Sequence, residues 1–526
     1  MRPGLTRTTN LGHLLTQAAR RFPDRHALIR GEAVTTWAAL DARVDAAVRG
    51  LRRCGVGKGE RILVHLRNGA EMVETMFAAF KLGAIWVPTN VRLTPPEVAY
   101  LAASSRAVAM VTEPDFAGHI AAAREASPAL RHVFVTGQGG GGEAGWDGLV
   151  AAGEAGDGQP REAAVDRDDP LWFFYTSGTT GRPKAAVLTH GQMGFVVTNH
   201  LADLVPGTTE EDVSLVVAPL SHGAGIHLLT QVARGAASVL PAGDRLDPEE
   251  AWGLVARHRV TNMFTVPTIL KRLVEHEAVA RHDHASLRHV IYAGAPMYRE
   301  DQRRALAALG KVIVQYFGLG EVTGNITVLP AAWHSEDDAL MPVGSCGFPR
   351  TAMEVAILGP DGEELPPGET GEIVARGPAV FAGYFENEEA NAKAFAGGWF
   401  HTGDLGHLDA RGLLTITGRQ SDMYISGGSN VYPREIEEVL LTLPGVAEAT
   451  VVGVADHEWG EAGIAVVVPA PGARLEPASI LAALKGRLSR YKHPRRVVVW
   501  QELPRSGYGK VPKNVIRQWL VERGEV

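Results

Sequence analysis

Residues 171–184 read Leu-Trp-Phe-Phe-Tyr-Thr-Ser-Gly-Thr-Thr-Gly-Arg-Pro-Lys, and this stretch decides how the chain is interpreted. Its first five residues are apolar and predict a buried strand. The rest forms a loop rich in hydroxyl groups and glycine. Gly178 and Gly181 let backbone N–H groups approach phosphate oxygens, and Lys184 adds a compact positive charge. The spacing differs from that of a Walker loop, so the stretch predicts a phosphate-binding loop of another type.

The chain around this loop alternates short apolar runs with stretches of helical periodicity, which occur at 11–19 and 46–51. A Gly-rich segment from 137 to 145, extending to about Asp169, predicts a surface loop. The pattern favours an α/β fold with parallel-rich sheets covered by helices. Apolar runs predict further strands at 61–65, 107–112, 133–136, 214–218, 260–266 and 311–315.

A domain boundary is expected near residue 420, where a turn-rich segment ends. The remaining hundred or so residues have strand and helix signals of their own. We therefore expect a large N-terminal domain, residues 1–419, and a small α+β C-terminal domain, residues 420–526. The signals in the second domain are strands at 449–454 and 464–468 and helices at 433–441 and 477–488.

The composition is that of a globular protein, with 526 residues, 45% hydrophobic and 21% charged. The 52 basic and 59 acidic residues give a formal charge of -7, so no global charge attracts nucleic acid or an anionic membrane. Cys54 and Cys346 are too few for a disulfide framework. Neither a signal peptide nor a long apolar stretch is recognised, so we expect a cytoplasmic protein without a transmembrane segment. The oligomeric state is left open, with a homodimer among the options.

The loop resembles the phosphate-loop signature of the adenylate-forming superfamily, which includes acyl-CoA synthetases, peptide-synthetase adenylation domains and beetle luciferases. Ala185 departs from the glycine that the family has after the lysine. A flexible turn would be the simpler reading of the loop alone. Further segments resemble the same family in the same order, however, and together they cover nearly the whole chain. The loop residues implied in ATP binding are Thr176, Ser177, Gly178, Thr179, Thr180, Gly181 and Lys184.

The resemblance also implies roles for segments farther along the chain. Phe317 would stack on the base, and Glu321 would hold Mg²⁺. Asp404 would accept the ribose hydroxyls, with Arg419 as a second ribose or phosphate contact. Lys510 matches the family's catalytic lysine. The strip along adenine would be Gly294, Ala295 and Pro296, and the segment over the nucleotide would contain Gln315, Tyr316, Phe317, Gly318, Gly320 and Glu321.

Two half-reactions follow from this resemblance. A carboxylate attacks the α-phosphorus of ATP, with Lys184, Glu321 and Lys510 as the catalytic residues. Coenzyme A then displaces AMP after the C-terminal domain has rotated about a hinge at Ser421 or Asp422. The residues implied in binding coenzyme A are Gly427, Gly428 and Trp459.

Two departures from the family are expected to change kinetics rather than abolish activity. Gly320 replaces the usual threonine and removes a polar contact worth on the order of 1 kcal/mol. Ser421 stands where the hinge usually has Asp or Lys.

The acid itself is predicted only as a class. His222 falls where amino-acid-activating domains carry an aspartate, which disfavours an amino acid, although a packed core histidine is an alternative reading. The mostly apolar neighbours leave fatty and aromatic acids both open. The residues expected to line the acyl pocket are His222, Gly223, Tyr292, Met297 and Leu319.

The sequence therefore predicts an AMP-forming carboxylic acid–CoA ligase that uses ATP, Mg²⁺ and coenzyme A. A free-standing adenylation enzyme that loads a separate carrier protein is the first alternative. A nucleotide-binding homologue without catalysis is the second, and it is disfavoured because Lys184, Glu321, Asp404, Arg419 and Lys510 are all present.

Overall fold

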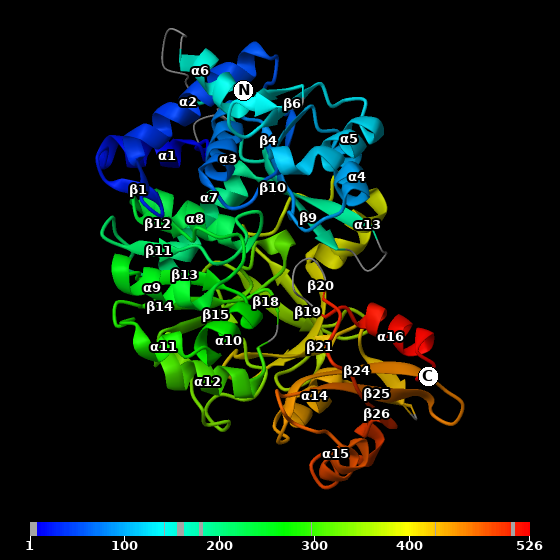
Figure 1. Ribbon diagram of the computed structural model, residues 1–526. Coiled ribbons are helices and arrows are strands. Elements are labelled where there is room, and N and C mark those ends of the chain that lie inside the picture. Colours follow the sequence, from blue (N-terminus) through cyan, green and yellow to red (C-terminus); the bar gives the residue numbers. More distant parts are fainter. Residues whose placement is uncertain are drawn as a thin grey trace.

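The structure is a computed structural model that describes residues 8–140, 142–154, 162–177, 182–295, 297–426, 428–505 and 511–526. Figure 1 shows two large sheets stacked in the upper part of the molecule, with the C-terminal residues below them. Both sheets are parallel at their centres and carry antiparallel strands at their edges. The predicted α/β fold with parallel-rich sheets is confirmed.

The first sheet has, within the described residues, nine strands in the order β17-β16-β15-β14-β13-β11-β12-β1-β2. Helices α9 (Pro248–His258), α10 (Pro267–Glu275), α11 (Ala278–Arg281) and α12 (Arg299–Leu309) lie beside it. Its strands are β1 (His26–Arg30), β2 (Ala33–Thr36), β11 (Val213–Leu215), β12 (Ala237–Leu240), β13 (Asn262–Thr265), β14 (His289–Tyr292), β15 (Ile313–Phe317), β16 (Thr327–Leu329) and β17 (Phe348–Pro349).

The second sheet follows the order β10-β9-β4-β3-β5-β6-β8-β7 in the part of the chain that the structure describes. Helices α4 (Pro95–Ser105) and α5 (Ala117–Ala126) lie on its outer side. Its strands are β3 (Arg61–His65), β4 (Ile85–Pro88), β5 (Ala109–Thr112), β6 (His132–Val135), β7 (Gly139–Gly140), β8 (Glu143–Gly145), β9 (Pro170–Ser177) and β10 (Pro183–Thr189).

The largest hydrophobic cluster joins the two sheets. It contains Trp86 and Trp172 from the second sheet, whose rings meet edge to face at 4.6 Å, and Ile291 and Val314 from the first. Burial of such large aromatic side chains dominates the stability of a core. Helices that contribute to this cluster include α1 (His13–Arg21), α2 (Trp37–Arg53), α3 (Ala70–Leu82), α7 (His190–Asn199) and α8 (Gly223–Arg234).

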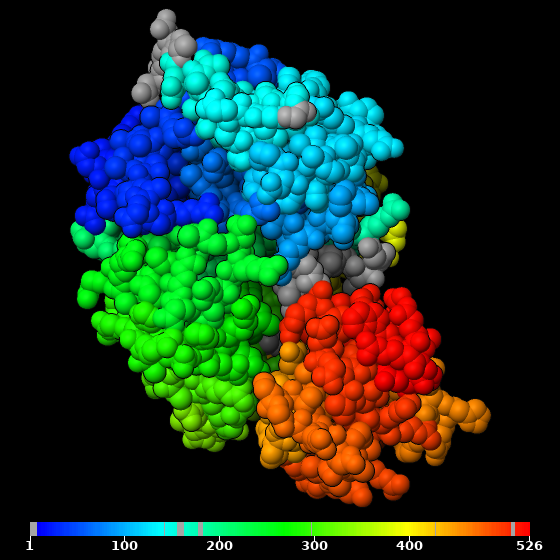
Figure 2. Space-filling view, in the orientation of Figure 1, coloured from blue at the N-terminus to red at the C-terminus, as the bar shows by residue number. Residues whose placement is uncertain are grey.

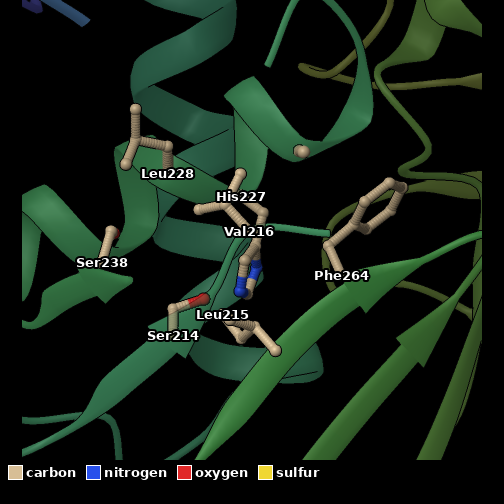
Figure 3. A pocket seen from close by; sticks show the side chains of 8 residues that line it. Ser214, Leu215, Val216, His227, Leu228, Ser238 and Phe264 are labelled. Carbon is tan, nitrogen blue, oxygen red and sulfur yellow. The ribbon is translucent and has the colours of Figure 1, made fainter. Parts of the chain in front are cut away.

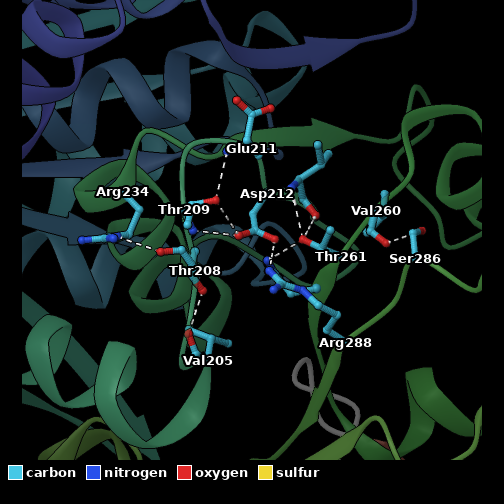
Figure 4. Close-up of polar contacts among 12 residues, drawn as sticks. Val205, Thr208, Thr209, Glu211, Asp212, Arg234, Val260, Thr261, Ser286 and Arg288 are labelled. Carbon is cyan, nitrogen blue, oxygen red and sulfur yellow. Dashed lines mark hydrogen bonds and ion pairs between the residues drawn. The ribbon is translucent and has the colours of Figure 1, made fainter.

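A polar network fastens strands of the first sheet at their amino ends (Figure 4). Asp212 accepts a hydrogen bond from the N–H of Thr209 at 2.7 Å and pairs with Arg288. Thr261 donates its N–H to the carbonyl of Val213 at 2.8 Å. Despite burial, these bonds hold the pKa of Asp212 below its usual value. The network fixes the strand register at the edge where these parallel strands begin, so their carboxyl ends are held on the opposite edge.

One sequence expectation is wrong. The segment from 137 to Asp169 was predicted to be a surface loop, but it contains helix α6 (Trp146–Glu154). Trp146 and Val150 are buried, and Gly153 lies so close to Ala46 that an added Cβ would come within 1.9 Å of its carbonyl oxygen. The glycines before this helix masked its short apolar face.

The predicted helix at 477–488 is shorter than expected. Helix α15 covers Pro477–Ala483, and the chain turns at Gly486, whose φ of +78° an L side chain rarely adopts.

Two smaller sheets complete the chain. The third sheet is antiparallel and consists of β18 (Glu354–Leu358), β19 (Gly371–Arg376), β20 (Phe400–Leu408) and β21 (Leu414–Arg419). The fourth consists of β22 (Tyr424–Ser426), β23 (Ser429–Val431), β24 (Val446–Asp456), β25 (Gly460–Pro469) and β26 (Arg496–Val499). The predicted domain boundary falls between β21 and β22, and its position stays a prediction.

Figure 2 shows the orange and red C-terminal residues gathered in a lobe at one end of the molecule. This lobe contains the helices α14 (Pro433–Leu441), α15 and α16 (Lys513–Glu522). Helix α13 (Glu388–Ala394) lies earlier in the chain, before β20. Among the described residues, no helix is both long and apolar enough to cross a membrane.

Glu437 of α14 connects this lobe to the rest of the chain. Its Oε1 lies 2.5 Å from the Nζ of Lys513 and accepts the N–H of Val451 at 2.8 Å. Its Oε2 accepts the hydroxyl of Tyr298, at the start of α12, at 3.1 Å. Only 5% of the Glu437 side chain is exposed. One buried carboxylate therefore ties the start of α16 to the first sheet's covering helix.

We expect Glu437→Ala to destabilise the C-terminal lobe by roughly 1 to 3 kcal/mol, because the half-buried ammonium of Lys513 loses its carboxylate partner and keeps only the carbonyl of Val451. Glu435→Ala is the matched control. Glu435 lies in the same helix, is 43% exposed and pairs with Lys492 at the surface, so its loss should cost less than about 1 kcal/mol. Hydrogen–deuterium exchange of peptides from β24 and β25 measures both values. Equal protection in the two variants would contradict this assignment.

Candidate nucleotide and acyl site

The centre of the candidate site is the carboxylate of Glu321, which is 4% exposed in the short 3₁₀ turn Gly320–Val322 after β15. Its Oε1 accepts hydrogen bonds from the hydroxyls of Thr176, at 2.8 Å, and Tyr384, at 2.9 Å. Among the described residues, no donor bonds to Oε2. A buried carboxylate whose second oxygen has no donor among the described residues suits a hard cation such as Mg²⁺, which prefers oxygen ligands.

Tyr384 reaches Glu321 because its segment pairs with the outer edge of β10. Val187 donates its N–H to the carbonyl of Gly383 at 2.9 Å, and Phe385 donates its N–H to that of Ala185 at 2.9 Å. Burial and the Glu321 carboxylate both raise the pKa of the Tyr384 hydroxyl, so it remains a hydrogen-bond donor.

The phosphate loop is closed by the pairing of β9 with β10. Ser177 lies opposite Pro183, and Thr176 lies opposite Lys184. The Nζ of Lys184 is 5.4 Å from the ring centroid of Tyr384. The hairpin thus brings Thr176 and Lys184 to the Glu321 group, and their role in binding an anion stays a prediction.

Several predicted residues lie outside the described residues, and their roles stay predictions. They are Gly178, Thr179, Thr180, Gly181, Pro296, Gly427 and Lys510.

Asp404 and Arg419 lie directly opposite each other on β20 and β21. Asp404 is 5% exposed, and its Oδ1 accepts the Nε–H of Arg419 at 2.8 Å. The Asp404 charge is the main cause of the raised pKa of Arg419, and Glu321 contributes to it as well. Thr402 fixes the aspartate by accepting its N–H at 3.0 Å. The structure therefore brings the two predicted ribose residues together and within electrostatic reach of Glu321.

The strands β14 and β15 end beside this group. Gly294 follows β14 with φ of +81°, a conformation that favours glycine, and Ala295 comes next. On β15, Gln315 and Phe317 are half-buried, whereas Tyr316 is buried. The Tyr316 ring stacks on Phe264 with centroids 6.0 Å apart. This side chain therefore packs in the core beneath β15.

Gly318 lies too close to Gly324 to carry a side chain, because an added Cβ would come within 2.6 Å of the Gly324 Cα. The turn that bears Glu321 is therefore folded tightly back on itself. Leu319, the residue before this turn, packs against the large cluster between the sheets.

The predicted acyl-pocket residues fall into two places. His222 and Gly223 form the start of α8, where His222 Nδ1 lies 2.8 Å from the hydroxyl oxygen of Ser221. Gly223 is covered by Phe264, whose Cζ would be 2.5 Å from an added Cβ. Met297 and Tyr292 instead belong to a second hydrophobic cluster around α12.

The Tyr292 hydroxyl is already engaged in that second cluster. It lies 3.1 Å from Gln315 Oε1, 3.1 Å from His334 Nε2 and 3.0 Å from the Gln302 amide nitrogen that donates to it. Tyr292 therefore orients Gln315, and the hydroxyl is not free to contact a ligand. Its predicted place in the acyl pocket stays a prediction.

A small cavity lies beside Phe264 and His227 (Figure 3). His227 Nε2 is 2.8 Å from Asn262 Oδ1, and burial lowers the pKa of this histidine to about 4, so the ring is neutral near pH 7. The cavity measures about 10 Å³, close to the space of a single water. It is lined by Ser214, Leu215, Val216, Ala224, His227, Leu228, Ser238 and Phe264.

Two of the predicted coenzyme A residues, Gly428 and Trp459, lie next to strands of the fourth sheet. Ser426 pairs with Gly460 across β22 and β25, so the turn at Gly428 lies near Trp459. Trp459 is 41% exposed. Within the described residues, no contact joins Gly428 or Trp459 to the Glu321 group, so their role stays a prediction.

The predicted hinge residues, Ser421 and Asp422, lie in the turn between β21 and β22. The backbone carbonyl of Arg419 accepts the N–H of Asp422 at 3.1 Å and that of Met423 at 3.0 Å. The turn is therefore anchored to the residue that pairs with Asp404.

Sequence reasoning missed two side chains of this site. Tyr384 lies 63 positions from Glu321 and has no local motif that marks it. Phe174 had a usable signal, because it lies two residues before Thr176 and so on the same face of the strand. It was read only as part of an apolar run.

Comparison with known families accounts for most of the chain. Residues 15–385 match the AMP-binding enzyme family, and residues 435–510 match the AMP-binding enzyme C-terminal domain.

Individual relatives match along the full length. A feruloyl-CoA synthase from an Amycolatopsis species is 37% identical over 516 residues, which cover 97% of this chain and 99% of the relative. An indoleacetate–CoA ligase from Aromatoleum aromaticum is 35% identical over 508 residues, 96% of each chain. ATP-bound MatB from Rhodopseudomonas palustris has a similar structure, with a TM-score of 0.87, 28% identity and coverage of 97% and 99%. The chain therefore belongs to the adenylate-forming acyl-CoA synthetase family of AMP-binding enzymes, as its motifs predicted.

Proposed function

We propose that this chain is an AMP-forming ligase that joins an apolar carboxylic acid, aromatic or fatty, to coenzyme A. The observation that carries the proposal is the buried Glu321 carboxylate, which Thr176 and Tyr384 hold beside Lys184 at the end of the phosphate loop. The relatives named for feruloyl-CoA and indoleacetate support an acid with an aromatic ring.

The first half-reaction joins two anions, so the site must neutralise and align them. The phosphate loop and Lys184 bind the phosphates, and Asp404 with Arg419 holds the ribose. A carboxylate oxygen of the acid forms a bond to the α-phosphorus, and the bond to pyrophosphate breaks. Glu321 would hold Mg²⁺ through Oε2, and the bound ion supplies charge neutralisation at the phosphates. Lys510 bridges the acid and the α-phosphate.

The second half-reaction transfers the acyl group. The thiol of coenzyme A attacks the acyl carbonyl, the bond to the phosphate oxygen breaks, and AMP leaves. In this proposal the C-terminal domain, residues 420–526, turns about Ser421 or Asp422, which removes Lys510 and brings Gly427, Gly428 and Trp459 to the site.

A cytoplasmic location belongs to the same proposal. Both cysteines are free, and Cys346 is buried, which fits a reducing compartment.

The principal test is a panel of fatty and aromatic acids offered with MgATP and coenzyme A. We expect acyl-CoA and pyrophosphate in equal amounts with at least one class of acid, measured by mass spectrometry and a pyrophosphate assay. Pyrophosphate exchange without acyl-CoA would favour the carrier-protein alternative. Binding of ATP without turnover of any acid would contradict the proposal that the chain is an enzyme.

Lys510→Ala separates the two half-reactions. Adenylation should fall by on the order of 100-fold or more, because a charge that stabilises the transition state is lost. Thioester formation from a supplied acyl-adenylate should largely survive, because the lysine leaves the site before that step. Equal loss of both rates would contradict the two-orientation mechanism.

Tyr384→Phe tests the support of Glu321. Removing the hydroxyl that donates to Oε1 should raise the Mg²⁺ concentration for half-maximal adenylation by roughly tenfold, the usual effect of losing a group that orients a metal ligand. The KM for the acid should stay unchanged. Tyr491→Phe, at a residue 38% exposed in the C-terminal lobe, is the control. A Tyr384→Phe variant with normal Mg²⁺ dependence would rule out this role.

A further inference from the structure

Gly320, the residue before Glu321, is covered by the ring of Phe174. A Cβ at position 320 would lie 2.6 Å from Cδ1 and 2.7 Å from Cε1 of that ring, and 3.0 Å from Cγ2 of Thr176. Gly320 does not have a positive φ. Space, rather than backbone conformation, therefore requires glycine here, because real Cβ atoms do not approach other atoms so closely.

Phe174 occupies a defined place between two parts of the site. It lies on the same face of β9 as Trp172, whose ring is 5.7 Å away, and as Thr176, which binds Glu321. Its ring also meets the His222 ring edge to face, with centroids 5.5 Å apart and an interplanar angle of 85°. Phe174 is half-buried. One aromatic ring thus separates the Glu321 group from the start of α8.

An acid that is to be adenylated must pass this ring. Its carboxylate has to reach the α-phosphate near Thr176 and Glu321, and its carbon chain then extends toward His222. Phe174 lies between these two ends, because its ring contacts His222 and Thr176 follows it two residues later on the same face of β9. The carbons next to the carboxyl group would therefore run along Phe174.

We propose that Phe174 is a specificity-determining residue that selects acids with planar carbons next to the carboxyl group, that is, arenecarboxylic or 2,3-unsaturated aryl acids. The inference rests on the proposed function and narrows its substrate class. The ring packs beside Gly320, Trp172 and His222, and its face is flat. Trigonal carbons can stack on the flat face of the ring. Tetrahedral carbons carry hydrogens that point toward the ring, so they remain farther from it.

Two acids with the same carbon skeleton test this directly. Cinnamic acid and 3-phenylpropanoic acid differ only in the double bond next to the carboxyl group. We expect kcat/KM of the unchanged enzyme to favour cinnamic acid by roughly tenfold or more. In Phe174→Leu, which keeps a large apolar side chain but loses the flat face, the ratio should fall to about one. The KM for ATP should not change. A general structural defect would change it.

The contact with Gly320 gives an independent test. Gly320→Ala should lower kcat/KM at least about tenfold, because the new methyl group displaces the ring. The double variant Phe174→Ala/Gly320→Ala should recover most of the adenylation rate but not the preference for cinnamic acid. Gly148→Ala is the matched control, since nothing lies within 4 Å of an added Cβ there. Thermal unfolding confirms that each variant is folded.

The outcomes separate the two levels of proposal. An active enzyme whose preference is missing, or is unchanged in Phe174→Leu, overturns this inference and leaves the ligase function standing. Normal kinetics of Gly320→Ala overturns it as well. Failure of the unchanged enzyme to activate any acid overturns the proposed function and the inference together.

Discussion

The antiparallel pairing of β9 with β10 is the constraint on which the site depends. Its register places Thr176 opposite Lys184, and the exposed edge of β10 binds the segment that carries Tyr384. A slip by one residue would turn Thr176 to the other face of the sheet. Glu321 would then lose one of its two donors. A single hairpin thus sets the positions of Ser177 and Pro183, on either side of the predicted phosphate loop, and of both hydroxyls that bind Glu321.

The charges around this hairpin do not favour the stability of the fold. Glu321 and Asp404 are both nearly buried, which is unfavourable for carboxylates without full compensation. Asp404 obtains a charged partner in Arg419, whereas the hydrogen bonds of Glu321 come from neutral hydroxyls. Sites that violate the rules of a stable core in this way are typical of function. The burial of apolar side chains in the large cluster between the sheets offsets the unfavourable free energy of these buried carboxylates.

Most of the fold was predictable because strands of a parallel sheet are continuous apolar runs. Residues 61–65 form β3 with the predicted bounds, and the other predicted strands differ only at their ends. Helix α6 was missed because its apolar face is short and glycines precede it. In the site, ordered motifs predicted Thr176, Glu321, Asp404 and Arg419. Tyr384 was out of reach, because only the pairing of its segment with β10, a tertiary contact, brings it to Glu321.

The packing of Phe174 on Gly320 also constrains how relatives of this chain can diverge. Position 320 cannot gain a side chain while the ring is in place, since even a methyl group would overlap it. Removing the ring first leaves a gap beside the turn that carries Glu321. If the proposed role of Phe174 holds, either single change alone lowers the activity. Descendants that accept a different acid are expected to have altered both positions together, and this coupling links two sites far apart in the gene.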